Sequence, residues 1–427
     1  MTVHVVRPGE SVWSIASQFG VSPDDIIGSN EMSDSTPLVV GQTLIIPTKE
    51  VTYVVRMGDS LYSIAEKFDV SMDSISKLNN IPSPNQIYPG MSIRIPQEAK
   101  KYGTIEVNAF IQPTTVENET KVLKEAIGDL TYLSPFSYHV NKDASLTPID
   151  DEFLISEAKK NGVAPMLVVS NISGANFDTE LINNILTNDS LQNTLIENIL
   201  STIETKGYYG VIIDFERISP EHRENYNEFL RKLVNKLHPK YIVATALAPK
   251  TYDITSGSWH GAHDYKAHGE IVDFVIIMTY EWGWSGGPPM AVAPINEVKK
   301  VIDYAVTVIP KNKIMMGMPM YGYDWTLPYI PKGEFAESVG NQEAIERAAT
   351  EGAQIKYDDK SQSPFYNYVD KDGKEHVVWF EDARSVMAKY MLVYNYGLRG
   401  VSYWALGKVF PQNWRVLENM FNIKKVV

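Results

Sequence analysis

The stretch YYGVIIDFERI, residues 208–218, places two carboxylates, Asp214 and Glu216, at the end of an otherwise apolar run. Side chains two residues apart on a strand lie on the same face, so we expect both acids to point the same way. Two such close carboxylates raise the pKa of one of them, and a carboxyl with a raised pKa can donate a proton at neutral pH. The pair predicts an acid catalyst for glycosidic bonds, although an Asp-x-Glu on a strand is often part of a structural salt bridge instead.

The position of the two acids also favours one route of cleavage. Because Asp214 and Glu216 share one strand, they would lie on the same side of the bond, where Asp214 is badly placed to attack the opposite face of a sugar ring. This placement favours a substrate-assisted route, in which the 2-acetamido oxygen of the sugar is the nucleophile.

The elements that would position these acids form a repeating pattern after residue 100. Apolar, β-rich runs alternate with segments of helical period. The candidate strands are residues 104–111, 131–138, 164–170, 209–216, 241–247, 273–280, 313–322 and 399–406. Eight such alternations predict an α/β fold, a (β/α)8 TIM barrel. The longest gap precedes the last strand, and we interpret residues 324–380 as an insertion that carries a hairpin with Asp372 and Gly373 at its turn.

Active sites of this architecture lie at the carboxyl ends of the strands. The polar and aromatic side chains expected there are Asn108, Ser137, Asn171, Asp214, Glu216, Tyr280, Glu281, Tyr321 and Trp404. Aromatic faces stack on sugar rings, and acids and amides bind hydroxyl groups, so this set is typical of a sugar site. Asn108 and Asn171 could equally satisfy buried backbone groups, and Trp404 could belong to the core.

The first hundred residues contain an internal repeat. VVRPGESVWSIASQFGVS, which begins at Val5, reappears as VVRMGDSLYSIAEKFDVS from Val54 without a gap. Each copy predicts a small βααβ module. The repeat resembles the LysM domain, which implies binding to polymers that contain N-acetylglucosamine, such as peptidoglycan or chitin. The resemblance places the glycan-binding positions near Gly9 and Asn30 in the first module and near Gly58 and Asn79 in the second.

The barrel is similar to glycoside hydrolase family 18, whose fourth strand carries Asp-x-x-Asp-x-Asp-x-Glu. This chain aligns Tyr209, Ile212, Asp214 and Glu216 with that motif, so the first two acids are missing. The resemblance implies that Glu216 acts as acid and then base, and that Asp214 orients the acetamido group. The loss of an acid at Ile212 suggests an altered pH profile.

Three further motifs resemble the same family. MTYE at residues 278–281 implies that Tyr280 binds the acetamido oxygen, with Glu281 where the family usually has Asp. ATALAPK at residues 244–250 resembles the signature of the fifth strand. Trp404 corresponds to the tryptophan that forms the floor of the cleavage subsite.

Composition excludes several classes of partner. The net charge is −13, which argues against nucleic acid or an anionic membrane as a partner. The chain has no cysteine, the histidines show no ligand spacing, and we expect neither a metal nor a cofactor. No leader and no membrane span are recognised at the amino end or elsewhere. A monomer is favoured.

The combined resemblance is to spore-germination hydrolases, which are N-acetylglucosaminidases acting on fragments of cortex peptidoglycan. It implies modules at residues 2–48 and 51–97, a barrel at 102–427, and a location at the coat or cortex boundary of a spore after synthesis in the mother cell. Two alternatives remain, a chitinase and an inactive glycan-binding spore protein. Retention of both Asp214 and Glu216 argues against the inactive protein.

Overall fold

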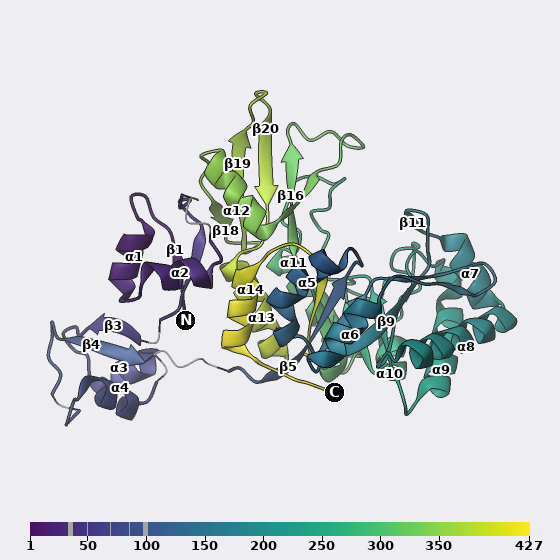
Figure 1. The fold of residues 1–427 in the computed structure, drawn as a ribbon, viewed down its shortest axis with the longest axis horizontal. Coiled ribbons are helices and arrows are strands. Elements are labelled where there is room, and N and C mark those ends of the chain that lie inside the picture. The colour runs from purple at the N-terminus through teal and green to yellow at the C-terminus, as the bar shows by residue number, and fades with distance from the viewer. Residues whose placement is uncertain (33–36, 49, 69, 85, 97–100) are drawn as a thin grey trace.

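The computed structural model describes residues 1–32, 37–48, 50–68, 70–84, 86–96 and 101–427. Two small modules at the amino end are followed by a barrel that carries an inserted sheet (Figure 1). The predicted class, a TIM barrel preceded by two βααβ modules, is confirmed. The predicted end of the second module at residue 97 lies outside the described residues.

Each module pairs two antiparallel strands with two helices between them. The first contains β1 Thr2–Val5, α1 Val12–Phe19, α2 Pro23–Ser29 and β2 Thr43–Ile46. The second contains β3 Glu50–Val54, α3 Leu61–Phe68, α4 Met72–Asn79 and β4 Ser92–Pro96. The side chain of Ser11 caps α1 by accepting a hydrogen bond from the amide of Ser14. Gly9 and Gly58 form equivalent turns with φ of 83° and 89°, a backbone region that favours glycine.

The barrel strands lie within the predicted runs, but the strand predicted at 209–216 ends at Asp214, and Tyr321 from the run at 313–322 belongs to a strand of the insertion, Tyr321–Thr326. The barrel strands are β5 Thr104–Ile111, β6 Tyr132–Pro135, β9 Ala164–Ser170, β12 Gly210–Asp214, β13 Ile242–Leu247, β14 Phe274–Ile277, β15 Ile314–Pro319 and β21 Gly400–Leu406. All pair in parallel with their neighbours, and the pairing of β21 with β5 closes the ring. The interior is filled by apolar side chains, including Ile212, Phe274 and Met315.

Helices cover the outside of the barrel (Figure 1). They are α5 Val116–Ala126, α6 Glu152–Lys160, α7 Thr179–Thr187, α8 Asp189–Lys206, α9 Arg223–Leu237, α10 Tyr265–Ile271, α11 Ile295–Val308, α13 Ala383–Tyr396 and α14 Pro411–Met420. In α9 the buried residues Tyr226, Phe229, Leu230, Leu233 and Leu237 recur at helical spacing, so one stripe packs on the barrel. Among the described helices, none has the length and apolar character needed to cross a membrane.

The insertion between β15 and β21 is a five-stranded antiparallel sheet with one helix. Its elements are β16 Tyr321–Thr326, β17 Glu337–Gly340, α12 Asn341–Thr350, β18 Lys356–Asp358, β19 Ser363–Val369 and β20 Glu375–Trp379. The predicted hairpin is present as β19 and β20, and Gly373 in its turn has φ of 80°. The sequence indicated only this hairpin, because β17 and β18 are short and lack a clear alternation.

The first module is docked on the barrel and the insertion. The amide of Ile355, just before β18, donates to the carbonyl of Val40 at 2.9 Å. Thr43 and Gln412 of α14 exchange two hydrogen bonds of 2.8 and 2.7 Å. Val39 is buried in the core of the insertion. By contrast, no hydrogen bond or ion pair joins the described residues of the second module to the barrel, and Figure 1 shows that module at one end of the molecule.

Candidate active site

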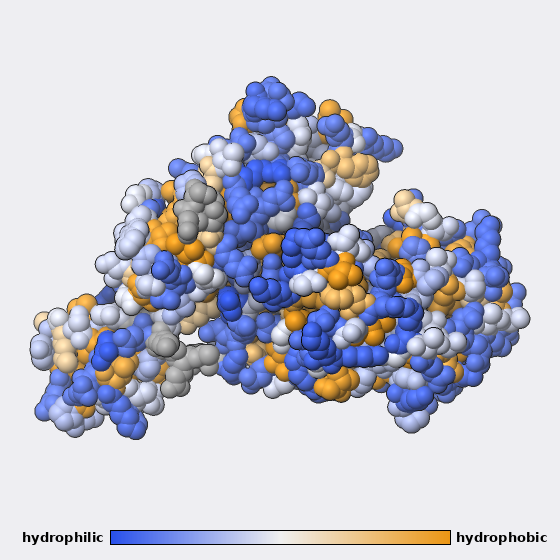
Figure 2. All heavy atoms as spheres, viewed as in Figure 1, coloured by the Kyte–Doolittle hydropathy of each residue, from blue (hydrophilic) through white to orange (hydrophobic). Residues whose placement is uncertain are grey.

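A cavity of about 430 Å³ opens at the carboxyl ends of the barrel strands. It contains both acids of the predicted pair, together with Tyr280, Glu281 and Trp404. Figure 2 shows the corresponding notch in the surface, between the insertion and the part of the molecule around α7. The strand ends therefore bring together five of the predicted site residues in one cavity.

The two acids are buried at the bottom of this cavity. Asp214 is the last residue of β12 and is 5% exposed, and Glu216 lies two residues further on and is 7% exposed. Burial disfavours the charged form and raises the pKa of both carboxyls. The negative charge of Asp214 raises the pKa of Glu216 further, while the charge of Arg217 lowers it. Glu216 is thus suited to hold a proton near neutral pH.

An apolar residue lies where the family motif has an inner acid. Ile212 is fully buried and packs inside the barrel with Phe274 and Met315. Among the described residues, Oδ1 of Asp214 has no hydrogen-bond partner. A buried acceptor without a partner is costly, so this oxygen is available to a donor on a ligand.

Asn171 holds the main chain of Glu216 from the neighbouring strand. Its Nδ2 donates to the carbonyl oxygens of Glu216 at 2.9 Å and Asp178 at 3.1 Å, and its Oδ1 accepts from the amide of Glu216 at 2.9 Å. Asn171 is fully buried and does not line the cavity. These contacts give it a positioning role, and direct binding of substrate by Asn171 stays a prediction.

Asn108 and Ser137 also lie beneath the cavity. Strand β5 continues to Ile111, so Asn108 is in the middle of the strand and not at its end, as the sequence had suggested. Its side chain donates to Ser402 at 2.8 Å and accepts from Ser134 at 2.6 Å. Ser137 shares a 2.8 Å hydrogen bond with Ser170. The side chains of both residues are engaged within the barrel.

Tyr280 and Trp404 line the cavity from different strands. Tyr280 follows β14, and burial together with the charges of Asp214, Glu216 and Glu281 raises its pKa, so the phenol remains a hydrogen-bond donor. Trp404 lies in β21 and packs edge-on against Phe136 and Phe110. An aromatic face held in this way suits the stacking of a sugar ring.

Glu281 connects the barrel to the insertion. Its carboxylate accepts hydrogen bonds from the hydroxyls of Tyr321 and Tyr323 in β16, the latter at 2.9 Å. Burial raises the pKa of Glu281, while the two tyrosine hydroxyls lower it. Its φ of 69° is uncommon for a residue with a side chain, as is often found at functional sites.

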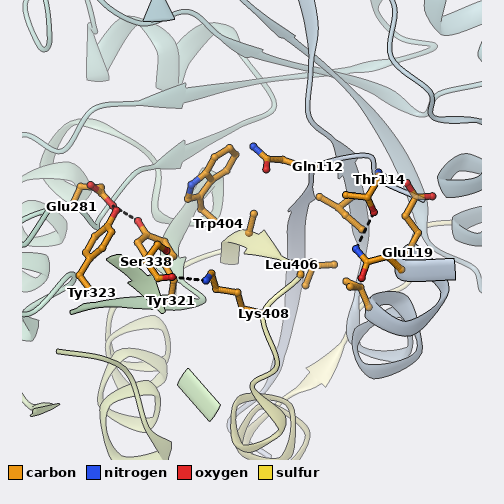
Figure 3. Close-up of a pocket in the computed structure, with 15 residues that line it drawn as sticks. Gln112, Thr114, Glu119, Glu281, Tyr321, Tyr323, Ser338, Trp404, Leu406 and Lys408 are labelled. Atoms are coloured by element: carbon orange, nitrogen blue, oxygen red, sulfur yellow. Dashed lines mark hydrogen bonds between the residues drawn. The ribbon is translucent and has the colours of Figure 1, made fainter. Parts of the chain in front are cut away.

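A second cavity of about 400 Å³ adjoins the first. Gln112, Glu281 and Trp404 line both cavities, so the two form one cleft. Figure 3 shows Trp404 and Gln112 at its centre, with Tyr321, Ser338 and Lys408 on one side and Thr114 and Glu119 on the other.

Several lining residues were missed by the sequence analysis. Gln112 directly follows β5 and could have been found, because the predicted run ends at Ile111 as β5 does, but Asn108 was chosen as the residue at its end. Arg217 and Trp259 line the first cavity and Lys408 the second. They lie in loops, where sequence periodicity gives no signal. Among the described residues, no cluster of three or more histidine, cysteine, aspartate or glutamate side chains could hold a metal.

The repeated asparagines of the modules have the same contacts in both copies. Asn30 donates to the carbonyls of Ile26 and Ile45 at 2.8 Å and accepts from the amide of Ile45 at 2.7 Å. Asn79 is bonded in the same way to Ile75 and Arg94. Each therefore fastens a helix to the closing strand. Glycan binding at Gly9, Asn30, Gly58 and Asn79 stays a prediction.

Known proteins resemble this chain over its whole length. The cortical fragment-lytic enzyme of Bacillus subtilis (strain 168) is 48% identical, with 100% of this chain and 99% of the relative covered. The enzyme of the same name from Bacillus anthracis is 46% identical, with 98% of each chain covered. The crystal structure of the spore cortex-lytic enzyme SleL from Bacillus megaterium QM B1551 has a TM-score of 0.91 at 41% identity and covers 100% of this chain and 99% of its own.

Family descriptions match the separate parts of the chain. The LysM domain family matches residues 4–47 and 53–96, and the family described as glycosyl hydrolases family 18 matches residues 112–408. The chain therefore belongs to glycosyl hydrolases family 18, as a glycosidase with two amino-terminal LysM modules.

Proposed function

We propose that this protein hydrolyses the β-1,4 bond that follows N-acetylglucosamine in fragments of spore cortex peptidoglycan. The observation that carries the proposal is the placement of Asp214 and Glu216 at the bottom of one cavity with Tyr280 and Trp404. The names of the relatives, cortical fragment-lytic and spore cortex-lytic enzyme, support the choice of substrate.

In the first step, Glu216 donates its proton to the leaving glycosidic oxygen. The 2-acetamido oxygen of the sugar at Trp404 attacks the anomeric carbon from the opposite face as that bond breaks, and an oxazolinium ion forms. Oδ1 of Asp214 has no partner among the described residues. It accepts a hydrogen bond from the N–H of the acetamido group and stabilises the positive charge of the oxazolinium ion. The hydroxyl of Tyr280 donates a hydrogen bond to the acetamido oxygen and so orients the acetamido group.

In the second step, Glu216 is the base. Its carboxylate removes a proton from a water molecule, which attacks the anomeric carbon and reopens the oxazolinium ring. Two displacements at one carbon retain its configuration. The carboxyl is then protonated again and ready for another bond.

The LysM modules bind the same glycan outside the cleft. Two weak sites on one chain raise the local concentration of glycan at the barrel. The natural partner is therefore peptidoglycan, or a chitin-like glycan with N-acetylglucosamine. The relatives' names, cortical fragment-lytic and spore cortex-lytic enzyme, support a role in the spore. On this proposal the protein acts there as a monomer, at the boundary of coat and cortex.

The direct test is mass spectrometry of products from purified cortex fragments. We expect the wild-type protein to release fragments with N-acetylglucosamine at the reducing end, and Glu216→Gln to release none. Glu221→Gln is a matched control, because Glu221 is an exposed acid that lines neither cavity of the cleft.

The same assay on chitin oligomers decides between the alternatives. A chitinase from Chromobacterium violaceum resembles this chain at 26% identity with a TM-score of 0.69. Cleavage of chitin oligomers without cleavage of cortex fragments would favour a chitinase. If the wild-type protein cleaves neither chitin oligomers nor cortex fragments, the result would favour a glycan-binding protein without activity.

A further inference from the structure

Two cations lie on opposite sides of the mouth of the barrel. Arg217 follows Glu216 beyond β12 and lines the first cavity, and Lys408 follows β21 and lines the second (Figure 3). In the ring of strands, β13, β14 and β15 separate β12 from β21 on one side, and β5, β6 and β9 separate them on the other. The two cations therefore flank the carboxylate pair and Trp404.

Neither cation forms an ion pair with a described residue, although the charge of Arg217 lowers the pKa of Glu216 and that of Lys408 lowers the pKa of Glu337. Among the described residues, no carboxylate lies within ion-pair distance of Arg217 or Lys408. Lys408 donates one hydrogen bond to the carbonyl of Ser338 at 2.9 Å, which leaves two of its hydrogens free. The guanidinium of Arg217 lies over the ring of Trp259 at 5.2 Å, and its φ is 58°, an uncommon value outside glycine.

Two further acids that line the cleft, Glu281 and Glu119, are engaged by hydrogen bonds to other groups. Glu281 accepts from Tyr321 and Tyr323, and Glu119 accepts from the amide of Thr114 at 2.7 Å. Figure 3 shows Glu119 across the cavity from Lys408. The protein as a whole has a net charge of −13, which repels an anionic ligand. Such a ligand therefore binds most favourably at a cation that has no carboxylate partner.

A neutral sugar polymer gains little binding energy from such cations, whereas a glycan that alternates neutral and acidic sugars gains more. This inference rests on the proposed function, in which N-acetylglucosamine lies at Trp404. Its neighbours in peptidoglycan are muramyl sugars, which carry a lactyl arm. That arm ends in a carboxylate, or in an amide-linked peptide that ends in one.

We infer that Arg217 and Lys408 bind the carboxylates on the lactyl arms of the two muramyl sugars that flank the cleaved N-acetylglucosamine. The two residues determine specificity, because they favour a glycan that alternates neutral and acidic sugars over chitin. Charge-assisted hydrogen bonds of this kind are stronger than those between neutral groups.

The test compares four tetrasaccharides. One is chitotetraose. The others alternate N-acetylglucosamine with a muramyl sugar whose lactyl acid is free, extended by one alanine, or closed into a neutral lactam. For Lys408→Gln and for Arg217→Gln, we expect the kcat/KM ratio of the acidic tetrasaccharides to chitotetraose to fall about fivefold. The free-acid and alanine forms show which carboxylate is bound. The kcat/KM of the lactam form should change in the variants only as much as that of chitotetraose.

Matched variants separate charge from structural damage. Lys408→Arg and Arg217→Lys keep the charge and should restore most of the ratio. Lys374→Gln removes a lysine from the exposed hairpin turn, outside both cavities, and should leave the ratio unchanged. The preference of the wild-type protein for acidic glycans should weaken as salt is added.

Two results would overturn the inference. One is an equal loss on all four tetrasaccharides. The other is the same loss on the lactam form as on the acids. Binding measured by calorimetry in a Glu216→Gln background keeps the test independent of hydrolysis: if the wild-type protein cleaves nothing, the proposed function fails, and the ratio of affinities still decides whether the cations select acids.

Discussion

At the scale of single residues, the environment of two carboxyls determines what they can do. Asp214 and Glu216 are nearly excluded from water, one above an isoleucine and the other next to an arginine. In water either acid would be ionised at neutral pH. In this cavity, burial and mutual repulsion favour a bound proton, and that proton is what a glycosidic leaving group needs.

The raised pKa of Glu216 predicts a stability that falls with pH. Above about pH 4.5, the ordinary value, the unfolded chain has lost this proton while the folded protein retains it. The contribution of Glu216 to the free energy of unfolding is thus full at low pH and declines as the pH rises toward the folded-state pKa. Glu216→Gln does not titrate. We expect its free energy of unfolding to exceed the wild-type value by a margin that grows as the pH rises above about 4.5.

Urea unfolding at several pH values measures this difference. Glu221→Gln, at an exposed position, should follow the wild-type protein throughout. A variant at Glu216 that loses stability relative to the wild type as the pH rises would contradict the predicted direction.

The charge of Arg217 predicts a shift of the pH profile. This charge lowers the pKa of Glu216, so Arg217→Gln should raise it. Because Glu216 must be protonated to donate, the alkaline limb of kcat/KM should move to higher pH in the variant. Chitotetraose is the suitable substrate, since it carries no acid of its own. A limb that stays in place or moves to lower pH would show that Arg217 does not act on Glu216.

At the scale of elements, the ends of neighbouring strands are joined by side chains. Asn171, after β9, binds the main chain of Glu216, after β12. Tyr321 and Tyr323 of β16 hold Glu281, after β14. The loops that carry the site are thereby fixed to the barrel and to the inserted sheet.

Removing the clamp on Glu216 should reduce turnover. In Asn171→Ala the amide and carbonyl of Glu216 lose their buried partner, which costs about 1 to 3 kcal/mol of stability. Misplacement of the acid should also lower kcat, by about tenfold or more, even where the protein is fully folded. Steady-state kinetics well below the melting temperature, with circular dichroism as a check on folding, measure both effects.

Asn183→Ala is the matched control. Asn183, in α7, binds the side chain and the amide of Ser219 in the same loop, at 2.7 and 3.1 Å. Its loss should reduce stability with a much smaller effect on kcat. Equal losses of kcat in both variants would mean that Asn171 supports the loop in general and not Glu216 in particular.

At the scale of the whole molecule, two copies of one module have different surroundings. The first is joined to the insertion and to α14 by hydrogen bonds and a shared core. The face that docks in the first copy is open in the second: Tyr88, the counterpart of Val39, is 65% exposed, whereas Val39 is 4% exposed. The first module is thus part of the catalytic body, and the second is free to hold glycan.

Two equivalent glycines test this difference. Gly41 and Gly90 have φ of 89° and 88°, so alanine is equally strained at both. A Cβ at Gly41 would lie 1.8 Å from the carbonyl oxygen of Ile355, whereas a Cβ at Gly90 would meet no atom within 4 Å. We expect Gly41→Ala to loosen the docked module and to lower the melting temperature by several degrees more than Gly90→Ala. Hydrogen exchange in β2 and β18 should increase in Gly41→Ala only. Identical behaviour of the two variants would mean that the interface contributes no stability.

The sequence by itself determined the architecture and the acids. Eight apolar runs separated by helical periods specify a barrel, because side-chain periodicity is a local property that each segment displays on its own. The modules are visible as a repeat, and Asp214 and Glu216 stand out as acids at the end of an apolar run. The hairpin of β19 and β20 was also readable, because its turn requires a glycine.

Only the tertiary structure decided which distant groups meet. That Asn171 clamps Glu216, and that Lys408 and Arg217 lie on opposite sides of the cleft, depends on how separate strands are arranged in the ring. The different surroundings of two nearly identical modules likewise depend on Ile355 and Gln412, hundreds of residues away. Contacts between remote segments leave no periodic pattern in either one, so they become visible only once the chain is folded.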